Sequence, residues 1–381
     1  MERQKEIDIE KNNKGEREKG KETKESVGKE ERVEGKEKEE RKERKEKKEE
    51  RKKRGAIAAV LALLLAGAAL FILGRMGMLS GNLMRYLLQI CLYIVLGQSW
   101  NMLSGFAGMT SLGQQLYVGL AGYALTVGSA YYGLSLPGCL GLALGVSFLT
   151  ALLLSNLFFR IQGVYFGIAT WVAAEAMQMF FLSWKYVNQG GGMTAALSPY
   201  PSTREVFLLS LVLCYLVMAI ICVLLKSKVG LALLAMRDDP EGAMAIGIHL
   251  RRIRLFVYVL AALFTALCGV LFFVNKGVIY PDSGFSVSWT VSAVFICIIG
   301  GTGTVEGPVV GAVLYVLLRE ILAHYPGWSN IFLGIITILI IVFLPEGIVG
   351  SLHRRFHLPL FSDYLKRRPE EMVFLRHNYF S

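Results

Sequence analysis

Three consecutive stretches of the chain decide its fold: the apolar run VFLLSLVLCYLVMAIICVLL (206–225), the charged segment MRDDPEGAMAIGIHLRRIR (236–254) and the apolar run LFVYVLAALFTALCGVLFFVN (255–275). A helix rises about 1.5 Å per residue, so about 20 residues cross the hydrocarbon core of a membrane, which is roughly 30 Å thick. Each apolar run meets that length, and the segment between them carries the charges. The pattern predicts an all-α polytopic membrane protein in which residues 226–254 form a loop outside the membrane.

The charged segment also carries the signals of a short helix at both of its ends. Asp239 suits the N-cap, Pro240 suits the first helical position, and Gly247 is able to adopt the left-handed conformation that ends a helix. About seven residues would form a rod roughly 10 Å long. Its exposed surface is expected to present Glu241, Ala243, Met244 and Ile246. Such a capped helix is suited to docking into a groove of another protein.

Ten apolar runs have a length suited to a membrane span. They cover residues 56–74, 83–103, 108–131, 138–159, 163–183, 206–225, 255–275, 286–301, 305–323 and 329–345. Glycine is frequent in the third, eighth and ninth runs, and the eighth has only about 16 residues. Irregular backbone at membrane depth requires protein or a water-lined cavity around it, so these three spans are candidates for discontinuous or re-entrant helices.

The N-terminal 54 residues differ from the rest of the chain. They hold 22 Lys and Arg and 18 Asp and Glu with almost no apolar side chains, whereas the following 327 residues hold 19 and 12. Residues 1–54 are therefore predicted to be a disordered charged tail, and their interspersed Glu argues against nucleic-acid binding. The basic cluster 51–54, together with the basic residues of 226–254 and of the tail 351–381, predicts that both termini and the loop are cytoplasmic around a transmembrane domain of residues 55–350. The first apolar run begins too late for a usual signal peptide.

Two glycine-rich segments lie in or beside the predicted spans. In residues 101–122, Gly and hydroxyl residues replace the Leu of lipid-facing helices, so backbones should approach closely there. Either this composition serves helix packing, or Asn101, Gln114 and Gln115 line a pathway for a solute; both can hold together. Residues 300–312 lack a preceding strand and a following Lys-Ser/Thr pair, so a tight turn between helices is favoured over a nucleotide-binding loop.

Glu175 lies in the middle of the predicted span 163–183. A carboxylate at that depth requires a partner or a water-filled cavity, so Glu175 is either a pathway residue or a hydrogen-bonded residue of the helix packing. Metal chemistry is not indicated, because the six cysteines form no C-x-x-C pair and the histidines form no H-E-x-x-H pattern. We expect no metal and no other cofactor, and we find no paired carboxylates or Ser/Lys dyad that would indicate an enzyme.

In their order along residues 83–350, these segments resemble the LivM-type permease subunits of ABC importers for branched-chain amino acids. The matching segments are Asn101–Tyr123, Tyr165–Thr170 with Glu175, Arg237–Leu255, Gly277 with Pro281 and Phe285, Gly300–Ala312 and Pro345–Gly350. In such importers a cytoplasmic loop with an E-A-A-x-x-x-G pattern docks on the ATPase. This chain matches it at Glu241, Ala243 and Gly247, with Gly242 in place of the first alanine.

The resemblance implies a non-catalytic subunit that moves leucine, isoleucine and valine across the bacterial inner membrane by alternating access. It implies as partners two ATP-binding cassette ATPase subunits, a second homologous permease, a soluble substrate-binding protein and membrane lipid. The residues implied to couple to the ATPase are Asp239, Glu241, Ala243, Met244 and Gly247. Those implied to line the pathway are Asn101, Gln114, Gln115, Thr170 and Glu175.

Other functions stay open on the sequence. Related permeases move urea, short amides or other amino acids, and no residue here selects among them. The outer Gly-Gly-x-x-Gly segment of the family is altered to Gly190–Thr194, which leaves the identity of the substrate open. An ion-coupled secondary transporter with broken helices is a further alternative, which the scarcity of ionisable residues within the spans disfavours.

Overall fold

The computed structural model of the chain describes residue 65 and residues 67–161, 163–322, 329–344 and 346–356. Within these ranges the chain is helical apart from turns, short irregular segments and one two-stranded ladder, as the sequence predicts. The predicted tail 1–54, most of the tail 351–381 and most of the first predicted span lie outside the described residues. The described part of that span belongs to the apolar helix Gly67–Met76.

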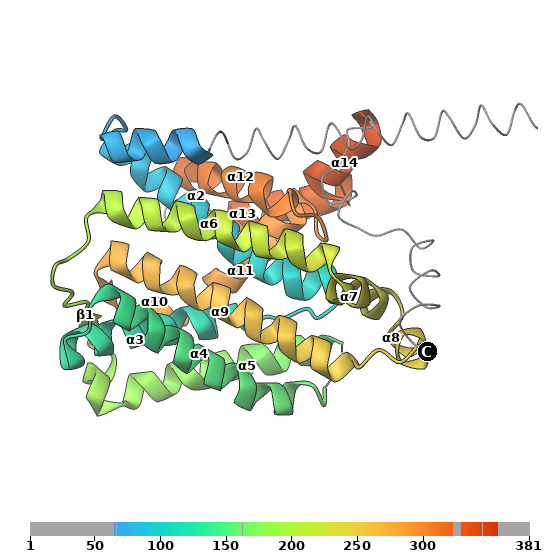
Figure 1. Cartoon of the computed structure of the whole chain (residues 1–381), viewed down its shortest axis with the longest axis horizontal. Coiled ribbons are helices and arrows are strands. Elements are labelled where there is room, and N and C mark those ends of the chain that lie inside the picture. The colour runs from blue at the N-terminus through green and yellow to red at the C-terminus, as the bar shows by residue number, and fades with distance from the viewer. Residues whose placement is uncertain (1–64, 66, 162, 323–328, 345, 357–381) are drawn as a thin grey trace, which may run out of the picture. The chain divides into compact units, whose positions relative to one another are not determined.

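The helices follow one another along the chain with short connections (Figure 1). They are α2 (Gly81–Asn101), α3 (Gln114–Tyr132), α4 (Leu136–Phe158), α5 (Val164–Ser183), α6 (Thr203–Lys226), α7 (Lys228–Asp238), α8 (Pro240–Ala245), α9 (Leu250–Lys276), α10 (Pro281–Gly284), α11 (Ser288–Gly300), α12 (Gly307–Leu322), α13 (Ser329–Phe343) and α14 (Gly347–Phe356). The short elements are the π-helical η1 (Met102–Phe106), the 3₁₀-helical η2 (Lys185–Gly190) and the strands β1 (Met193–Thr194) and β2 (Val278–Ile279).

Local sequence explains where the long helices begin and end. Ser80 caps α2, since its hydroxyl accepts a hydrogen bond from the backbone N–H of Leu83 at 3.3 Å. A capping box of Ser202 and Glu205 starts α6. Gly277 follows the last residue of α9 with a φ of +80°, a conformation that glycine adopts without steric cost. These signals fix the boundaries before any packing between helices is considered.

Among the residues that the structure describes, six helical stretches are long and apolar enough to cross a membrane. They are Gly81–Phe106, Leu136–Phe158, Val164–Ser183, Thr203–Lys226, Leu250–Lys276 and Pro281–Gly300. The predicted count of ten spans is therefore not confirmed. The predicted third span begins as helix only at Gln114, because residues 107–113 are irregular. The predicted eighth and ninth spans instead correspond to the continuous helices α11 and α12. Of the three glycine-rich runs, the third is therefore interrupted, whereas the described residues of the eighth and ninth are not.

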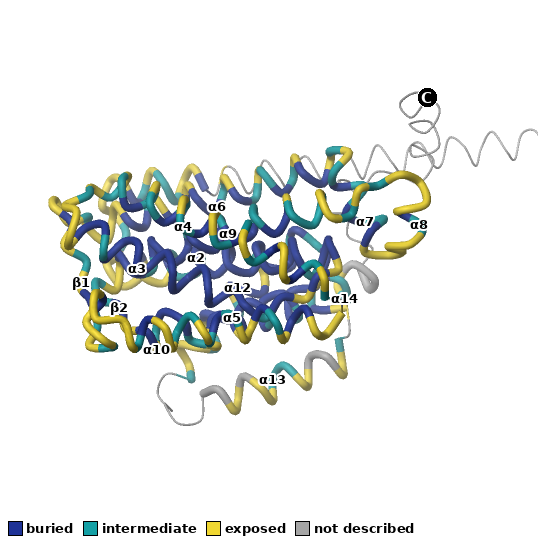
Figure 2. The backbone as a smooth tube through the Cα atoms, turned by 90° about the horizontal axis from the view of Figure 1, so that it is seen from below, coloured by how far each residue is buried: buried dark blue, intermediate teal, exposed yellow. Residues whose placement is uncertain are grey.

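Helices α2, α3 and α9 form the centre of the bundle. Helix α2 packs against α6, α9, α11 and α12, and α3 packs against α9 and α4. Figure 2 shows these central helices as largely buried. By contrast, only 28% of the residues are buried in the most apolar 18-residue stretch of α4, and likewise of α5, against 78% in that of Gly81–Phe106. The outer helices therefore present apolar side chains to their surroundings, as expected of a bundle in lipid.

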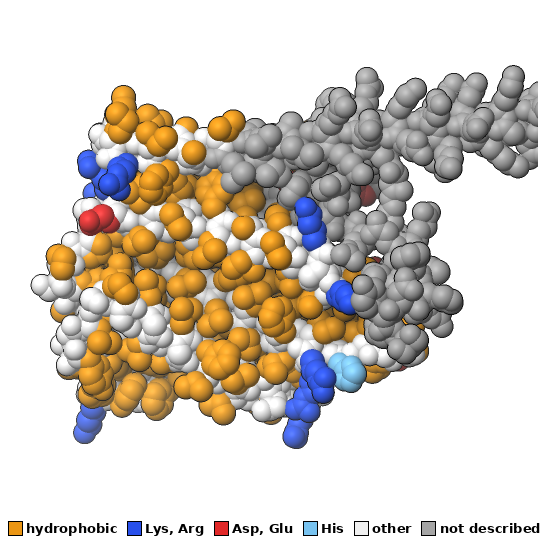
Figure 3. Space-filling view, viewed as in Figure 1, with side chains coloured by type: hydrophobic (Ala, Val, Ile, Leu, Met, Phe, Trp, Pro, Cys, Tyr) orange, Lys and Arg blue, Asp and Glu red, His pale blue; other side chains and the backbone are white. Residues whose placement is uncertain are grey.

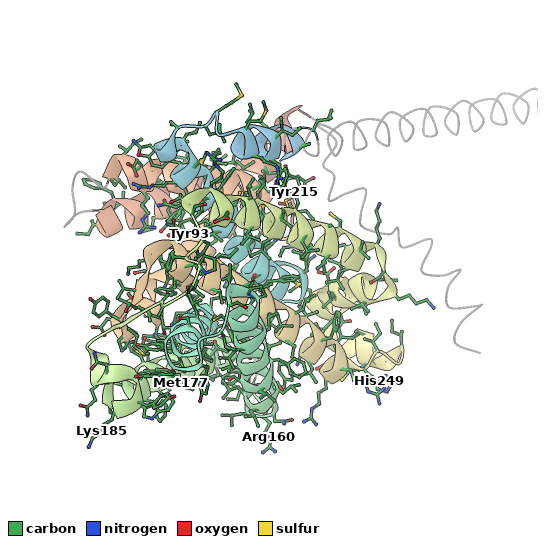
Figure 4. All side chains as sticks on the ribbon, turned by 60° about the vertical axis from the view of Figure 1, so that its left-hand side comes forward. Tyr93, Arg160, Met177, Lys185, Tyr215 and His249 are labelled. Carbon is green, nitrogen blue, oxygen red and sulfur yellow. The ribbon has the colours of Figure 1, made fainter. Side chains whose placement is uncertain are left out.

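The two ends of the bundle differ from its middle. Helices α7 and α8 lie at one end, and α10 lies with the β1–β2 ladder, in which Met193 pairs with Ile279, at the other (Figure 1). Figure 4 places His249 at the α8 end and Lys185 at the opposite end. On the face drawn in Figure 3, hydrophobic side chains cover the middle, and Lys and Arg gather near the two ends. This distribution is that of a multi-pass membrane protein.

Candidate functional site

The charged segment at one end of the bundle folds as the sequence predicts. Asp239 adopts an extended conformation, and its Oδ1 accepts a hydrogen bond from the Gly242 N–H at 3.0 Å, which caps α8. Pro240 is the first residue of that helix. Gly247 has a φ of +89°, and the Ile248 N–H donates to the carbonyl oxygen of Ala243 at 3.0 Å, which closes the C-terminal turn. The capped helix is therefore confirmed, with six residues.

One prediction about the surface of α8 is wrong. Met244 and Ile246 are 55% and 60% exposed, as expected, whereas Ala243 is only 3% exposed. The reason is that α8 packs against α7 and α9, and Ala243 lies on its inner side. The large exposed apolar side chains at this helix are consequently Met244 and Ile246, beside the exposed Glu241.

Gly242, which stands in place of the first alanine of the E-A-A-x-x-x-G pattern, lies against the Asp239 carboxylate. A Cβ atom added at this position would lie 2.3 Å from Asp239 Oδ2, closer than real Cβ contacts. Asp239 needs its carboxylate in this place in order to cap α8. An alanine at 242 would therefore require this carboxylate, the end of a flexible side chain, to shift.

Arg237, at the end of α7, connects this segment to the interior of the bundle. Its Nη1 donates a hydrogen bond to the carbonyl oxygen of Gly105 at 3.0 Å, and its guanidinium also pairs with Asp238 at 2.8 Å. Gly105 lies in the π-helical turn η1, where α2 ends. A Cβ on Gly108 would lie 3.2 Å from Arg237 Cγ, so the two backbones approach closely here. Sequence reasoning did not single out Arg237, because its partner is 132 residues away.

The two glycine-rich segments, which the sequence analysis treats separately, are in contact. Asn101 Oδ1 accepts a hydrogen bond from the Gly303 N–H, and Asn101 Nδ2 donates to the carbonyl oxygen of Thr304, both at 2.8 Å. One turn earlier, Gln98 Nε2 donates to the carbonyl oxygen of Val305 at 2.6 Å. These amides hold the turn between α11 and α12 against η1. Residues 301–306 of this segment form the predicted inter-helix turn, and residues 307–312 begin α12.

A cavity of about 580 Å³ lies between α5, α11, α12 and α13. Apolar side chains cover most of its wall, and hydroxyl groups supply the polar points. The residues that line it are Leu112, Trp171, Val287, Ser288, Thr290, Val291, Ser292, Val294, Phe295, Tyr315, Gly334 and Thr337. The hydroxyls of Ser292 and Tyr315 are 2.6 Å apart and hydrogen-bonded. An apolar cavity with a few placed hydroxyls has the composition of a small-molecule site.

The glutamines predicted for a pathway lie directly behind this wall. Thr290, which lines the cavity, donates to Gln115 Oε1, and its own hydroxyl accepts a hydrogen bond from the Gln114 N–H at 3.1 Å. Gln114 Oε1 in turn accepts from the hydroxyl of Thr265 at 2.8 Å. Both glutamines are buried. They position Thr290 rather than face the cavity.

Thr170 and Glu175 stand in the same relation to the cavity. The Thr170 hydroxyl accepts a hydrogen bond from the Leu112 N–H at 3.0 Å, and Leu112 lines the wall. Trp171, another lining residue, donates from Nε1 to Glu175 Oε1 at 3.0 Å. Four of the five predicted pathway residues therefore bond a lining residue, whereas Asn101 bonds the α11–α12 turn.

Comparison with known proteins identifies the family. A sequence model of the family described as "Branched-chain amino acid transport system / permease component" matches residues 82–344. The chain belongs to this permease family. Two relatives are the high-affinity branched-chain amino acid transport system permease protein LivM of Salmonella typhimurium, 27% identical, and that of Escherichia coli, 25% identical, each over 68% of both chains. The autoinducer 2 import system permease protein LsrC of Yersinia enterocolitica is 27% identical over 58% of this chain and 64% of its own.

The resemblance to LivM-type permeases is confirmed, and the chain is a transport permease subunit. No solved structure matches the chain significantly. The hydroxyl-bearing residues of the cavity are what sequence reasoning missed in this permease. Ser288 and Ser292 are four residues apart with Thr290 between them, and hydroxyls repeated within an apolar span were the available signal.

Proposed function

We propose that this permease is the membrane-spanning, non-catalytic part of an ABC importer that brings branched-chain amino acids into a bacterial cell. In this proposal the α8 end of the bundle faces the cytoplasm, and both termini lie on that side of the inner membrane. The observation that carries the proposal is the capped helix α8, which presents Met244 and Ile246 at one end of an apolar bundle. An exposed apolar pair on a short rigid helix is suited to a groove in an ATPase subunit.

Two ATPase subunits close on ATP, and each needs a docking helix. One permease supplies one α8, so the assembly needs a second, homologous permease. A soluble substrate-binding protein delivers the solute at the end that carries β1, β2 and α10. ATP hydrolysis in the ATPase subunits then moves α8, and this movement drives the conformational change of the permease.

Movement of α8 has a direct route to the interior. Helix α8 follows α7 with only Asp239 between them, and Arg237 in the last turn of α7 holds Gly105. From Gly105 the π-helical turn leads to Asn101, which holds the turn between α11 and α12. Helix α11 carries Ser288, Thr290 and Ser292, three of the hydroxyl residues that line the cavity. A shift of α8 is therefore expected to alter the wall of the cavity, which is what alternating access requires.

The chemistry of the cavity fits a small amphipathic solute. Val287, Val291 and Phe295 offer apolar surface to an aliphatic side chain. The Ser288 hydroxyl is able to donate to a carboxylate. The hydroxyls of Thr290, Ser292 and Tyr315 use their protons in hydrogen bonds within the protein, and their oxygens are able to accept from an ammonium group. Branched-chain amino acids combine these features, and the two LivM relatives support this choice of substrate over the solute named for LsrC.

The docking role of α8 is tested by two variants in the assembled transporter. Glu241→Lys reverses an exposed charge beside Met244 without disturbing the helix, and Ala243→Pro removes the N–H that donates to the carbonyl oxygen of Asp239 at 3.0 Å. We expect both variants to insert into the membrane and to lose co-purification of the ATPase and uptake of L-leucine. His249→Ala, at the N-cap of α9 without a side-chain cap bond, is the matched control and should retain both. Unchanged co-purification in both variants would show that α8 is not the docking element.

A further inference from the structure

A second cavity, of about 420 Å³, lies at the α8 end of the bundle. This volume falls within the range of small-molecule sites, about 300–1,000 Å³. Its wall joins the irregular segment before α3, the turn between α4 and α5, and the beginnings of α5, α8 and α9. The two cavities have Leu112 in common and otherwise different walls.

Most of this wall is apolar, and Arg254 brings a positive charge to it. The apolar lining residues include Met109, Phe159, Val164 and Phe166. The Nε of Arg254 is buried and has no hydrogen-bond acceptor among the residues that the structure describes. A buried donor left unpaired is unfavourable, and a bound acceptor would satisfy it.

The neighbouring carboxylates are engaged elsewhere. Asp239, next to the lining residue Pro240, uses Oδ1 to cap α8 at 3.0 Å from the Gly242 nitrogen. Asp238 pairs with Arg237 at 2.8 Å. Within the described part of the chain, no ion pair to Arg254 is formed. The guanidinium of Arg254 is therefore available to pair with an anion that enters the cavity.

We propose that this cavity binds a small aliphatic carboxylate, which enters from the α8 end of the bundle. The guanidinium of Arg254 pairs with the carboxylate, a planar acceptor that matches its donors, and the hydrocarbon chain lies against Met109, Val164 and Phe166. A ligand in this place touches both Pro240, the first residue of α8, and segment 108–112, which adjoins the Arg237 contact. A bound ligand would thus limit movement of α8 relative to the interior of the bundle, whichever solute the cavity at α11 accepts.

The test uses 4-methylpentanoate and its neutral isostere 4-methylpentanamide with the full-length protein in lipid nanodiscs. Saturation-transfer NMR, with empty nanodiscs subtracted, reports binding of each probe. We expect the acid to bind at least about tenfold more tightly than the amide, since only the acid makes a charge-assisted pair with Arg254. Arg254→Gln should abolish this preference. The control Arg252→Gln, which removes an exposed cation two residues away, should retain it.

Two further variants keep the proposal falsifiable if Arg254→Gln fails to fold. Arg254→Lys keeps the charge and should retain a weaker preference for the acid. Val164→Trp changes a side chain that is 77% exposed at the rim of the cavity and should block entry. Equal affinity for acid and amide, or acid binding unchanged in Val164→Trp, would overturn the proposal. Because the readout is binding and not uptake, a failure of the proposed transport function leaves this test unaffected.

Discussion

The charged segment 236–248 and the cavity at α11 differ in how their structures arise from the sequence. In the segment, the contacts that begin and end α8 are local: Asp239 caps a nitrogen three residues away, and Ile248 bonds a carbonyl five residues back. In the cavity, the deciding contacts join distant residues, such as Thr290 with Gln115, which are 175 residues apart. The capped helix in the segment is specified by a short stretch of sequence, whereas the cavity forms only after the helices have packed.

This difference separates two tasks. A docking element must keep its shape while it moves as a unit, and α8 is held by its caps together with its packing against α7 and α9. A cavity wall that alternates between two states must instead depend on contacts between elements, because those contacts are what changes. Arg237 is the residue that joins the two regions, since it belongs to the local segment and bonds the distant Gly105.

Among these variants, the largest effect is expected from removing the hydrogen bond between Arg237 and Gly105. In Arg237→Gln the hydrogen bond to Gly105 is lost; bonds of this kind with a charged donor contribute about 1.5–3 kcal/mol, or roughly tenfold to a hundredfold in an equilibrium. We expect L-leucine uptake in proteoliposomes to fall by about tenfold or more while the ATPase still co-purifies, because α8 itself is intact.

Arg252→Gln removes another cation near α8 and is the control for a change of charge alone. Uptake at the wild-type rate in Arg237→Gln would mean that movement reaches the interior without this contact. Loss of co-purification would instead place Arg237 in the docking surface. Either result would contradict the role of Arg237 as the residue that connects the charged segment to the cavity.

The second prediction concerns the wall of the cavity. Thr290→Val keeps the shape of the side chain and removes the hydroxyl that bonds Gln114 and Gln115. Two buried polar groups lose a partner, at about 1–3 kcal/mol each before relaxation, so the midpoint of thermal unfolding should fall and L-leucine uptake should drop severalfold. The outcome that speaks against this role is a lower unfolding midpoint with unchanged uptake.

Thr126→Val provides the matched control. Thr126 is also buried, but its hydroxyl bonds only the carbonyl oxygens of Gly122 and Tyr123 in its own helix. Its replacement should therefore affect unfolding less and leave uptake near the wild-type rate. A comparison of the two variants measures what a contact between helices contributes beyond the same chemistry within one helix.

The same distinction explains what sequence reasoning found. Asp239, Pro240 and Gly247 predicted α8 because caps act over three to five residues. In the described part of the chain, six of the apolar runs correspond to helices long and apolar enough to span a membrane, because length and composition decide that property. Ala243 was predicted to be exposed and is buried, since its inner position follows from packing against α7 and α9.

Long-range pairs were beyond the same reasoning. Asn101 was noticed as a polar residue in an apolar region, but the side chains of its partners do not identify them, because Asn101 bonds the backbone of Gly303 and Thr304. Gln114, Gln115, Thr170 and Glu175 were placed near a pathway on their polarity and on the family resemblance. Each bonds a residue of the cavity wall instead of lining it, and this second position cannot be read from one sequence.

The smallest effect is expected at Gly242, where two local terms oppose each other. Gly242→Ala should gain about 1 kcal/mol of helix propensity. The new Cβ would meet Asp239 Oδ2 at 2.3 Å, so the aspartate must rotate and its cap, also about 1 kcal/mol, is weakened. We therefore expect ATPase co-purification and L-leucine uptake within about twofold of the wild type, because α8 retains its exposed Met244 and Ile246. In Asp239→Ala the cap is lost without the compensating gain at 242, so the double variant with Gly242→Ala should recover part of the loss. If Gly242→Ala alone abolished docking, the glycine would be required for close approach of the ATPase and not for the cap.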